Sequence, residues 1–118
     1  ELKTIVKDPT AYESWHTALS SVNAIYLIVD RENGRQYVGS AYGKGGLLGR
    51  WSHYVGSLHG GNKLMKELLC DYPERYTDFQ FSILQLLPKA VTQEEVIHTE
   101  TLWKQKLLTY EPLGMNAN

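Results

Sequence analysis

The sequence predicts a small α/β or α+β domain built around a three-stranded sheet. Helical and strand patterns follow one another along it as helix, hairpin, two helices, strand and helix. The chain has 118 residues, 42% of them hydrophobic, which is enough for one buried core and too few for two domains. The apolar fraction argues against disorder. No apolar run approaches the roughly 18 residues that a membrane span requires.

A helix is expected at the start of the chain, over residues 8–20. Asp8 can cap it, the proline that follows suits the first helical position, and large apolar residues recur at helical spacing. The chain begins at Glu1 rather than at a methionine and opens with no signal peptide. We therefore expect residues 1–22 to be a leading helix at the end of a linker from a further N-terminal region. The domain itself is expected over 23–118.

An antiparallel hairpin is expected next, over residues 24–40. The apolar run 24–30 and the shorter run 36–40 are rich in strand formers. Asn33-Gly34 between them is the commonest signal for a tight hairpin turn.

The hairpin carries two tyrosines, Tyr26 and Tyr37, whose odd spacing places both on one face with a two- or four-residue loop. Packing in the core is the default interpretation of strand tyrosines. A two-residue turn at Asn33-Gly34 would leave them about four residues, roughly 13 Å, apart along the sheet. For both to serve one phosphate, the loop must be longer or bulged.

The remainder of the chain predicts two helices, a strand and a last helix. The helices are expected over about 47–58 and 62–72, with glycines between them. Alternating apolar residues predict a third strand over 78–87, closed by a proline. Thr92, with a glutamate three residues later, forms a capping box that opens the last helix, over about 93–108.

Positive charge gathers in the middle of the chain although the formal net charge is -1. Residues 31–66 contain one acid, Glu32, and six basic residues: Arg31, Arg35, Lys44, Arg50, Lys63 and Lys66. This stretch therefore carries +5 and the rest of the chain -6. A protein that holds a polyanion places such an excess on one face. Chance segregation on a small surface explains it equally well.

Glu100 does not fit the apolar pattern of the last helix. On a helical wheel it lies inside the sector of Val96, Trp103 and Leu107. A carboxylate in a buried stripe is costly unless it is paired or coordinates a cation. The structural interpretation is a salt bridge to one of the arginines. The functional one is a metal ligand or an acid–base group facing a cleft.

The helix over 47–58 has a similar polar edge, formed by Arg50, His53 and Tyr54. Arg50 and Tyr54 lie one turn apart. An arginine beside a hydroxyl suits an oxyanion such as phosphate, because the guanidinium offers a planar fork of donors. Alternatively, Arg50 packs along neighbouring aromatic rings.

Two other residues indicate less on their own. His59 stands at a helix end among glycines, where contact with the helix dipole explains it, and Asn116 lies in the C-terminal tail as a loop residue.

Cys70, the single cysteine, excludes an intrachain disulfide framework and a cysteine-cluster zinc site. Its apolar neighbours predict that it is buried. One cysteine predicts a reducing, intracellular compartment, the cytoplasm.

Taken in order, these residues resemble the motifs of the GIY-YIG nuclease family. Each motif is short and weak alone, but six in the expected order are specific together. They cover about residues 23–117: Ala24-Ile25-Tyr26, Tyr37-Val38-Gly39-Ser40, Arg50-Trp51 with Tyr54, His59, Glu100-Thr101-Leu102-Trp103, and Gly114-Met115-Asn116.

The resemblance implies a small three-stranded antiparallel sheet flanked by helices, in agreement with the predicted element order. It also implies cleavage of DNA phosphodiester bonds with one divalent cation. Carried over to this sequence, Glu100 would hold Mg²⁺ or Mn²⁺. Arg50 would bind the scissile phosphate and offset its developing negative charge.

The same resemblance implies roles for the other residues. Tyr26 is the expected general base for the attacking water, and Tyr37 positions that water or the phosphate. Tyr54 and His59 would contact the phosphate or assist proton transfer, and Asn116 would brace the site. A tyrosine with an ordinary pKa of about 10 is a poor base at neutral pH, so it needs positive charge nearby to favour the phenolate.

The chain also departs from the family pattern. Ala24 stands where the family name has glycine, and the loop from Gly39 to Arg50 is longer and rich in glycine. No separate DNA-reading module accompanies the domain. We therefore expect an additional targeting domain, N-terminal or separate.

Three functions are compared: a metal-dependent endonuclease, a catalytically silent nucleic-acid-binding module of the same fold, and a protein-interaction domain with a chance match. The first is favoured because the site residues are all present, and the third ranks last because it needs several coincidences. The sequence leaves open RNA as a substrate, the DNA structure cleaved and the oligomeric state. No membrane partner is expected.

Overall fold

The computed structural model describes residues 22–43, 45–57 and 63–117, with the backbone alone for 53–57 and 63. The leading helix expected over 8–20 lies outside the described residues. The described elements are β1 (Asn23–Asp30), β2 (Gln36–Ala41), α3 (Gly46–Ser57), α4 (Lys63–Asp71), the 3-10 helix η1 (Pro73–Asp78), β3 (Phe79–Leu87) and α5 (Gln93–Leu107).

This order confirms the predicted hairpin, two helices, strand and helix, with bounds that differ by at most one residue. The 3-10 helix was not predicted, and it begins where Pro73 ends the preceding helical pattern. The predicted N-cap of α5 is confirmed, since the Thr92 hydroxyl accepts a hydrogen bond from the Glu95 amide at 3.1 Å. Within the described residues, no helix is long and apolar enough to span a membrane.

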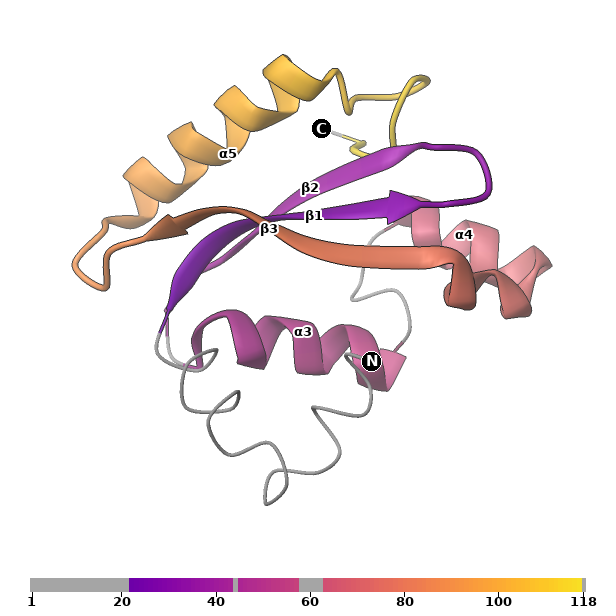
Figure 1. Ribbon diagram of the computed structural model, residues 1–118, viewed down its shortest axis with the longest axis horizontal. Coiled ribbons are helices and arrows are strands. Elements are labelled where there is room, and N and C mark those ends of the chain that lie inside the picture. The colour runs from indigo at the N-terminus through magenta and orange to yellow at the C-terminus, as the bar shows by residue number, and fades with distance from the viewer. Residues whose placement is uncertain (1–21, 44, 58–62, 118) are drawn as a thin grey trace.

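The three strands form one sheet in the order β2-β1-β3, and β1 pairs antiparallel with both neighbours (Figure 1). The predicted fold class, an α/β (α+β) domain with a small three-stranded antiparallel sheet flanked by helices, is confirmed. Because β1 is central and apolar, four of its first six residues are fully buried: Ala24, Ile25, Tyr26 and Ile28.

The hairpin loop is longer than the Asn-Gly signal predicts. Asp30 pairs with Arg35 through a 2.9 Å backbone hydrogen bond, so the loop has four residues, Arg31 to Gly34. Gly34 has φ +78° and donates its amide to the Asp30 carbonyl at 2.7 Å. The two-residue turn is therefore wrong, and the alternative of a longer loop is confirmed.

The longer loop also sets the register. Tyr26 pairs with Gly39 and Ile28 with Tyr37, so the two tyrosines lie two residues apart along the hairpin rather than four. They share one face of the sheet, as their odd spacing predicts.

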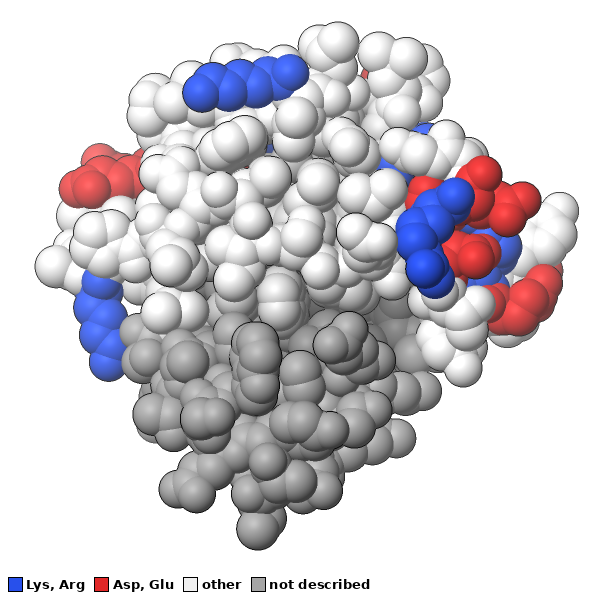
Figure 2. Space-filling model, in the orientation of Figure 1, with Lys and Arg blue, Asp and Glu red and all other residues white. Residues whose placement is uncertain are grey.

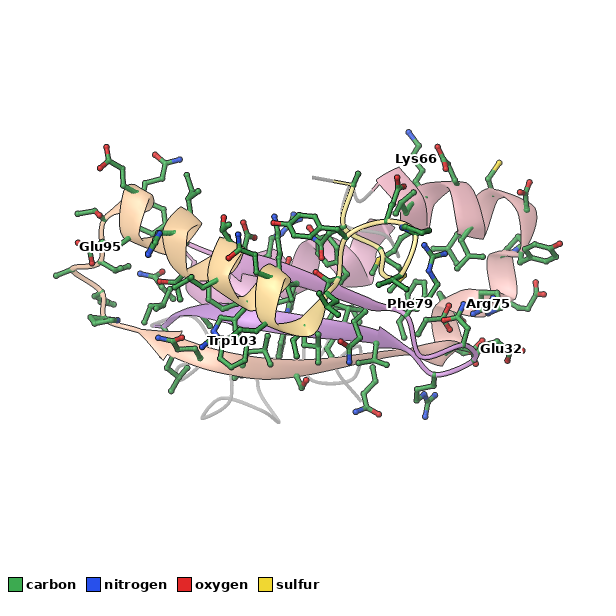
Figure 3. All side chains as sticks on the ribbon, turned by 90° about the horizontal axis from the view of Figure 1, so that it is seen from above. Glu32, Lys66, Arg75, Phe79, Glu95 and Trp103 are labelled. Atoms are coloured by element: carbon green, nitrogen blue, oxygen red, sulfur yellow. The ribbon has the colours of Figure 1, made fainter. Side chains whose placement is uncertain are left out.

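The two faces of the sheet bear different helices (Figure 1). On one face, α3 packs through Leu47 and Trp51 against a cluster that includes Tyr26. On the other face, α5 packs through Val96 and Trp103 against the remaining apolar residues of the sheet. Figure 3, seen from above, shows α5 in front of the sheet, with Trp103 labelled beside the helix.

An ionic cluster ties the hairpin loop to η1. Asp30 is 1% exposed; one of its carboxylate oxygens pairs with Arg75, and the other accepts the Glu32 amide at 3.0 Å. Arg75 also pairs with Asp78 at 2.8 Å. The hydrogen bond to Asp30 is the main cause that raises the pKa of Arg75 above its ordinary value. The group therefore stays charged, and the buried carboxylate keeps its counter-ion.

Basic and acidic side chains alternate in this cluster (Figure 2, right side). Arg31 belongs to it, donating to the carbonyls of Thr77 and Asp78 at 2.8 and 3.3 Å. The basic stretch 31–66 thus begins with a residue that binds its own fold. This part of the charge excess therefore has a structural role within the fold.

After α5, the tail returns to the free edge of β2. Leu108 adopts a left-handed conformation, φ 54°, that ends the helix. The Met115 amide then donates to the Gln36 carbonyl at 2.8 Å, and Arg35 Nη2 donates to the Gly114 carbonyl at 2.7 Å. The tail therefore lies against the outer edge of β2.

Candidate active site

Tyr26 and Gly39 form the floor of the candidate site. They are paired across the hairpin, and the Tyr26 ring lies directly over the glycine. A Cβ at Gly39 would lie under 3 Å from three atoms of the Tyr26 side chain. Only glycine leaves room for the ring, so the two signature motifs depend on each other sterically.

The Tyr26 hydroxyl meets an arginine at this point. Arg50 Nε donates to Tyr26 Oη at 3.2 Å, although the two residues are 24 positions apart. Tyr26 is 0% exposed, so its polar atom needs a partner inside the molecule. A cationic donor on the phenol oxygen stabilises the phenolate over the phenol. The sheet and α3 therefore bring together two of the residues that the sequence selects.

Aromatic rings surround this pair. The Tyr37 ring centroid lies 6.5 Å from that of Tyr26, at an interplanar angle of 51°. Trp51 meets Tyr26 edge to face at 6.3 Å and continues to Phe81 at 5.9 Å. Such contacts stabilise a ring beyond its buried area. They fix the direction in which the Tyr26 hydroxyl points.

Asn116 braces the strand that carries Tyr37. Its Oδ1 accepts the Val38 amide at 2.9 Å and its Nδ2 donates to the Val38 carbonyl at 3.0 Å. The side chain is buried at 3% exposure and reproduces the pair of bonds that a neighbouring strand would make. Val38 lies between Tyr37 and Gly39, so the contact holds β2 in place at the site.

Glu100 lies in the other layer, because α5 covers the face of the sheet opposite α3. Its side chain is 18% exposed, in line with the position that the sequence predicts for it within the apolar sector of α5. It forms an ion pair with Lys104, one turn along the same helix, at 3.5 Å. The expected arginine partner is therefore wrong, and the pair is local to α5.

Two expected site residues cannot be placed. His59 lies outside the described residues, and Tyr54 belongs to the part of α3 for which only the backbone is described. Cys70 is exposed on α4, so the prediction of a buried thiol is wrong. The buried side of that helix runs through Met65, which leaves Cys70 on its outer side.

A carboxylate oxygen is a ligand that suits Mg²⁺ or Mn²⁺. No group of three or more His, Cys, Asp or Glu that could hold a metal occurs among the described residues. Mg²⁺ is commonly held by one or two carboxylates together with substrate phosphates. The single carboxylate of Glu100 fits that mode of binding rather than a cage made by the protein alone.

Two contributors to the site were missed by sequence reasoning. The steric need for glycine at position 39 follows from the register, which the turn signal misjudged. Lys104 stands four residues after Glu100, and this spacing is itself a signal for an ion pair on a helix.

Comparison with known proteins identifies the family of the chain. The family model of the GIY-YIG catalytic domain matches residues 22–113. The chain therefore belongs to the GIY-YIG family, in agreement with the motifs on which the resemblance rests.

Two solved structures share the fold. One is the catalytic domain of the homing endonuclease I-TevI: identity is 22%, the TM-score is 0.64, and the match covers 81% of this chain and 98% of that one. The other is a mutant of the catalytic domain of the intron endonuclease I-TevI, with 22% identity, a TM-score of 0.65, and coverage of 82% and 94%. No curated protein matches the chain.

Proposed function

We propose that this domain is a metal-dependent endonuclease that hydrolyses DNA phosphodiester bonds. The observation that carries the proposal is the hydrogen bond from Arg50 to the buried hydroxyl of Tyr26, whose ring lies over Gly39, where only glycine leaves room for it. Family membership and the fold shared with the catalytic domain of an endonuclease support it. The match over most of the chain argues against a chance resemblance in a protein-interaction domain.

In the proposed reaction, Arg50 binds the scissile phosphate and offsets the charge that develops on its oxygens. The residue is half-buried, and one of its nitrogens already contacts the Tyr26 hydroxyl; a guanidinium carries its donors in a planar fork that matches phosphate. Arg50 can thus contact the proposed base, Tyr26, and the phosphate at the same time. The contact orients the phosphate relative to the base and also supplies positive charge.

Tyr26 accepts the proton of the attacking water in this proposal. The Arg50 donor favours the phenolate, and the surrounding rings keep the oxygen in a fixed direction. Tyr37, which is half-buried, orients the water or the phosphate from the next strand. Tyr54 and His59 are proposed to assist at the phosphate, and Asn116 to hold β2 through Val38.

Glu100 is the residue proposed to hold one Mg²⁺ or Mn²⁺. When bound, such a cation supplies Lewis acidity to the phosphate and the leaving oxygen. The contribution of this chain is the half-buried carboxylate itself, kept on the sheet-facing side of α5 by the apolar residues around it.

DNA is the proposed partner, and sequence choice is assigned to a further DNA-targeting domain or protein. On the face in Figure 2, basic and acidic side chains are both present among the described residues. We propose a reducing intracellular compartment, in which the exposed Cys70 stays a thiol.

The test is nicking of supercoiled plasmid with Mg²⁺ or Mn²⁺, with EDTA and Glu100→Ala as controls. Nicking that needs the metal and disappears in the variant supports the proposal. Binding of the plasmid without nicking supports the silent nucleic-acid-binding module instead. If the plasmid is neither bound nor nicked, both the endonuclease and the silent binding module are contradicted. A structured RNA offered in parallel decides which nucleic acid is cleaved.

A further inference from the structure

The ion pair between Glu100 and Lys104 differs from an ordinary pair on a helix surface. Both side chains are largely buried, at 18% and 13% exposure, and their charged atoms lie 3.5 Å apart. Exposed pairs at this spacing contribute little, because water and salt screen them. With water largely excluded, the same charges interact more strongly, and each becomes costly without the other.

This position matters because Glu100 is the carboxylate proposed to hold the divalent cation. An ammonium group beside the carboxylate competes with the cation for its oxygen atoms and repels it. A lysine, unlike an arginine, is a compact point charge on a flexible stem, so it can leave the carboxylate without rearranging the helix. In the free protein, the positive charge of Lys104 therefore opposes metal binding at Glu100. The lysine can move away from the carboxylate once other ligands of the metal are present.

We propose that Lys104 is a positioning residue that neutralises Glu100 until substrate phosphate brings the cation to the site. Phosphate oxygens complete the coordination of Mg²⁺ in many sites that have few protein carboxylates. The cation and the DNA then bind with positive coupling, and the metal-free protein holds little cation by itself. The inference rests on the proposed function, through the assignment of Glu100 as the metal ligand.

The test measures binding of Mn²⁺ alone, without DNA, from the electron paramagnetic resonance signal of the free ion. Lys104→Met removes the charge while it keeps an unbranched chain, and we expect Mn²⁺ affinity to rise about tenfold, within the usual range of coupling between sites. Lys104→Arg keeps a positive charge at this position, and its Mn²⁺ affinity is expected to stay near that of the wild type. Thermal unfolding recorded on the same samples separates altered metal affinity from altered stability.

Lys106 gives the matched control. It is exposed, lies in the same last turn of α5, and stands over the Trp103 ring at 5.3 Å from the centroid. Lys106→Met removes one positive charge from the same region without touching the ion pair. It is expected to change Mn²⁺ affinity by less than a factor of about two, because an exposed charge is well screened.

Each outcome decides one question. Equal Mn²⁺ affinity in Lys104→Met and the wild type, including no detectable binding by either, overturns the role of Lys104. An equal rise in Lys104→Met and Lys106→Met also overturns it, because net charge alone then explains the gain. Unchanged affinity in Glu100→Gln contradicts the metal assignment in the proposed function. Loss of Mn²⁺ in that variant, without a gain in Lys104→Met, contradicts only the inference about Lys104.

Discussion

The two faces of the sheet are packed by different kinds of side chain, although both take residues from the central strand β1. On the α5 face, Ile25 packs with Val38 and Val96, and the cluster is mainly aliphatic. On the α3 face, Tyr26 and Trp51 form the centre, with Tyr37 packed against them. An aliphatic face is satisfied by burial alone, whereas a buried phenol also needs a hydrogen-bond partner.

That difference explains where a buried polar group with a cationic partner is found in this fold. The partner of the buried phenol is Arg50, which helix α3 supplies to the aromatic face. The aliphatic face has no comparable need, and its charged contributor, Glu100, pairs with Lys104 on its own helix. A fully buried hydroxyl on a central strand is thus a more specific mark of a site than surface charge.

The largest effect is expected from Tyr26→Phe, which removes one oxygen from the aromatic face and keeps its packing. We expect the nicking rate to fall about 10³-fold, within the range for loss of a general base. Plasmid binding should stay near the wild-type level. The measurement is nicking under single-turnover conditions, with Tyr72→Phe, an exposed tyrosine, as the control. Cleavage that survives in Tyr26→Phe would transfer the role of base to Tyr37.

Gly39→Ala tests the steric dependence between the two motifs. The new Cβ would meet the Tyr26 ring, and such overpacking destabilises a fold by about 1–3 kcal/mol. Urea unfolding measures the loss. The same change in a Tyr26→Ala background should cost much less, because the ring is gone. Equal costs in both backgrounds would show that the ring does not set the need for glycine.

Asn116→Asp tests the brace on β2. An aspartate still accepts the Val38 amide but places an oxygen against the Val38 carbonyl, and we expect a loss of about 1–3 kcal/mol in unfolding free energy. Asn33→Asp is the matched control. Its side chain only accepts, from the Arg35 amide at 2.9 Å, and it is exposed, so its change should stay within about 0.5 kcal/mol.

The smallest effects compare the two faces directly. Ile25 and Ile28 are both fully buried on β1 and belong to opposite clusters. Each change to valine should cost about 0.5–1.5 kcal/mol in chemical unfolding. Ile28→Val, at the position paired with Tyr37, should lower the nicking rate of the folded protein more than Ile25→Val does. A matching loss of rate in Ile25→Val would abolish the distinction between the faces.

Most of the fold could be predicted from the sequence, because strand and helix patterns and the Thr92 cap are local signals. The loop length could not. Asn33-Gly34 favours a two-residue turn, but the Asp30 side chain binds the Glu32 amide and Arg75, and the second of these contacts crosses 45 residues. Such a long-range ion pair leaves no periodic trace in the sequence.

The candidate site was predicted in part for the same reason. The odd spacing of Tyr26 and Tyr37 predicts a shared face, which the register confirms. The helical wheel indicates that Glu100 is half-buried; its partner Lys104 stands four residues later, a spacing typical of ion pairs on helices that the interpretation with an arginine overlooked. The hydrogen bond between Arg50 and Tyr26 depends on how α3 packs on the sheet, so only the structure reveals it.

The tail that supports Tyr37 has a second consequence, for the solubility of the chain. β2 is an edge strand, and free edges are sites at which sheets of separate molecules join and aggregate. The contacts of Met115 and Asn116 occupy hydrogen-bonding groups of Gln36 and Val38 along that edge. Met115 and Asn116, in an irregular segment, thus form hydrogen bonds that a further strand would otherwise form. They leave little of this edge for another molecule to pair with.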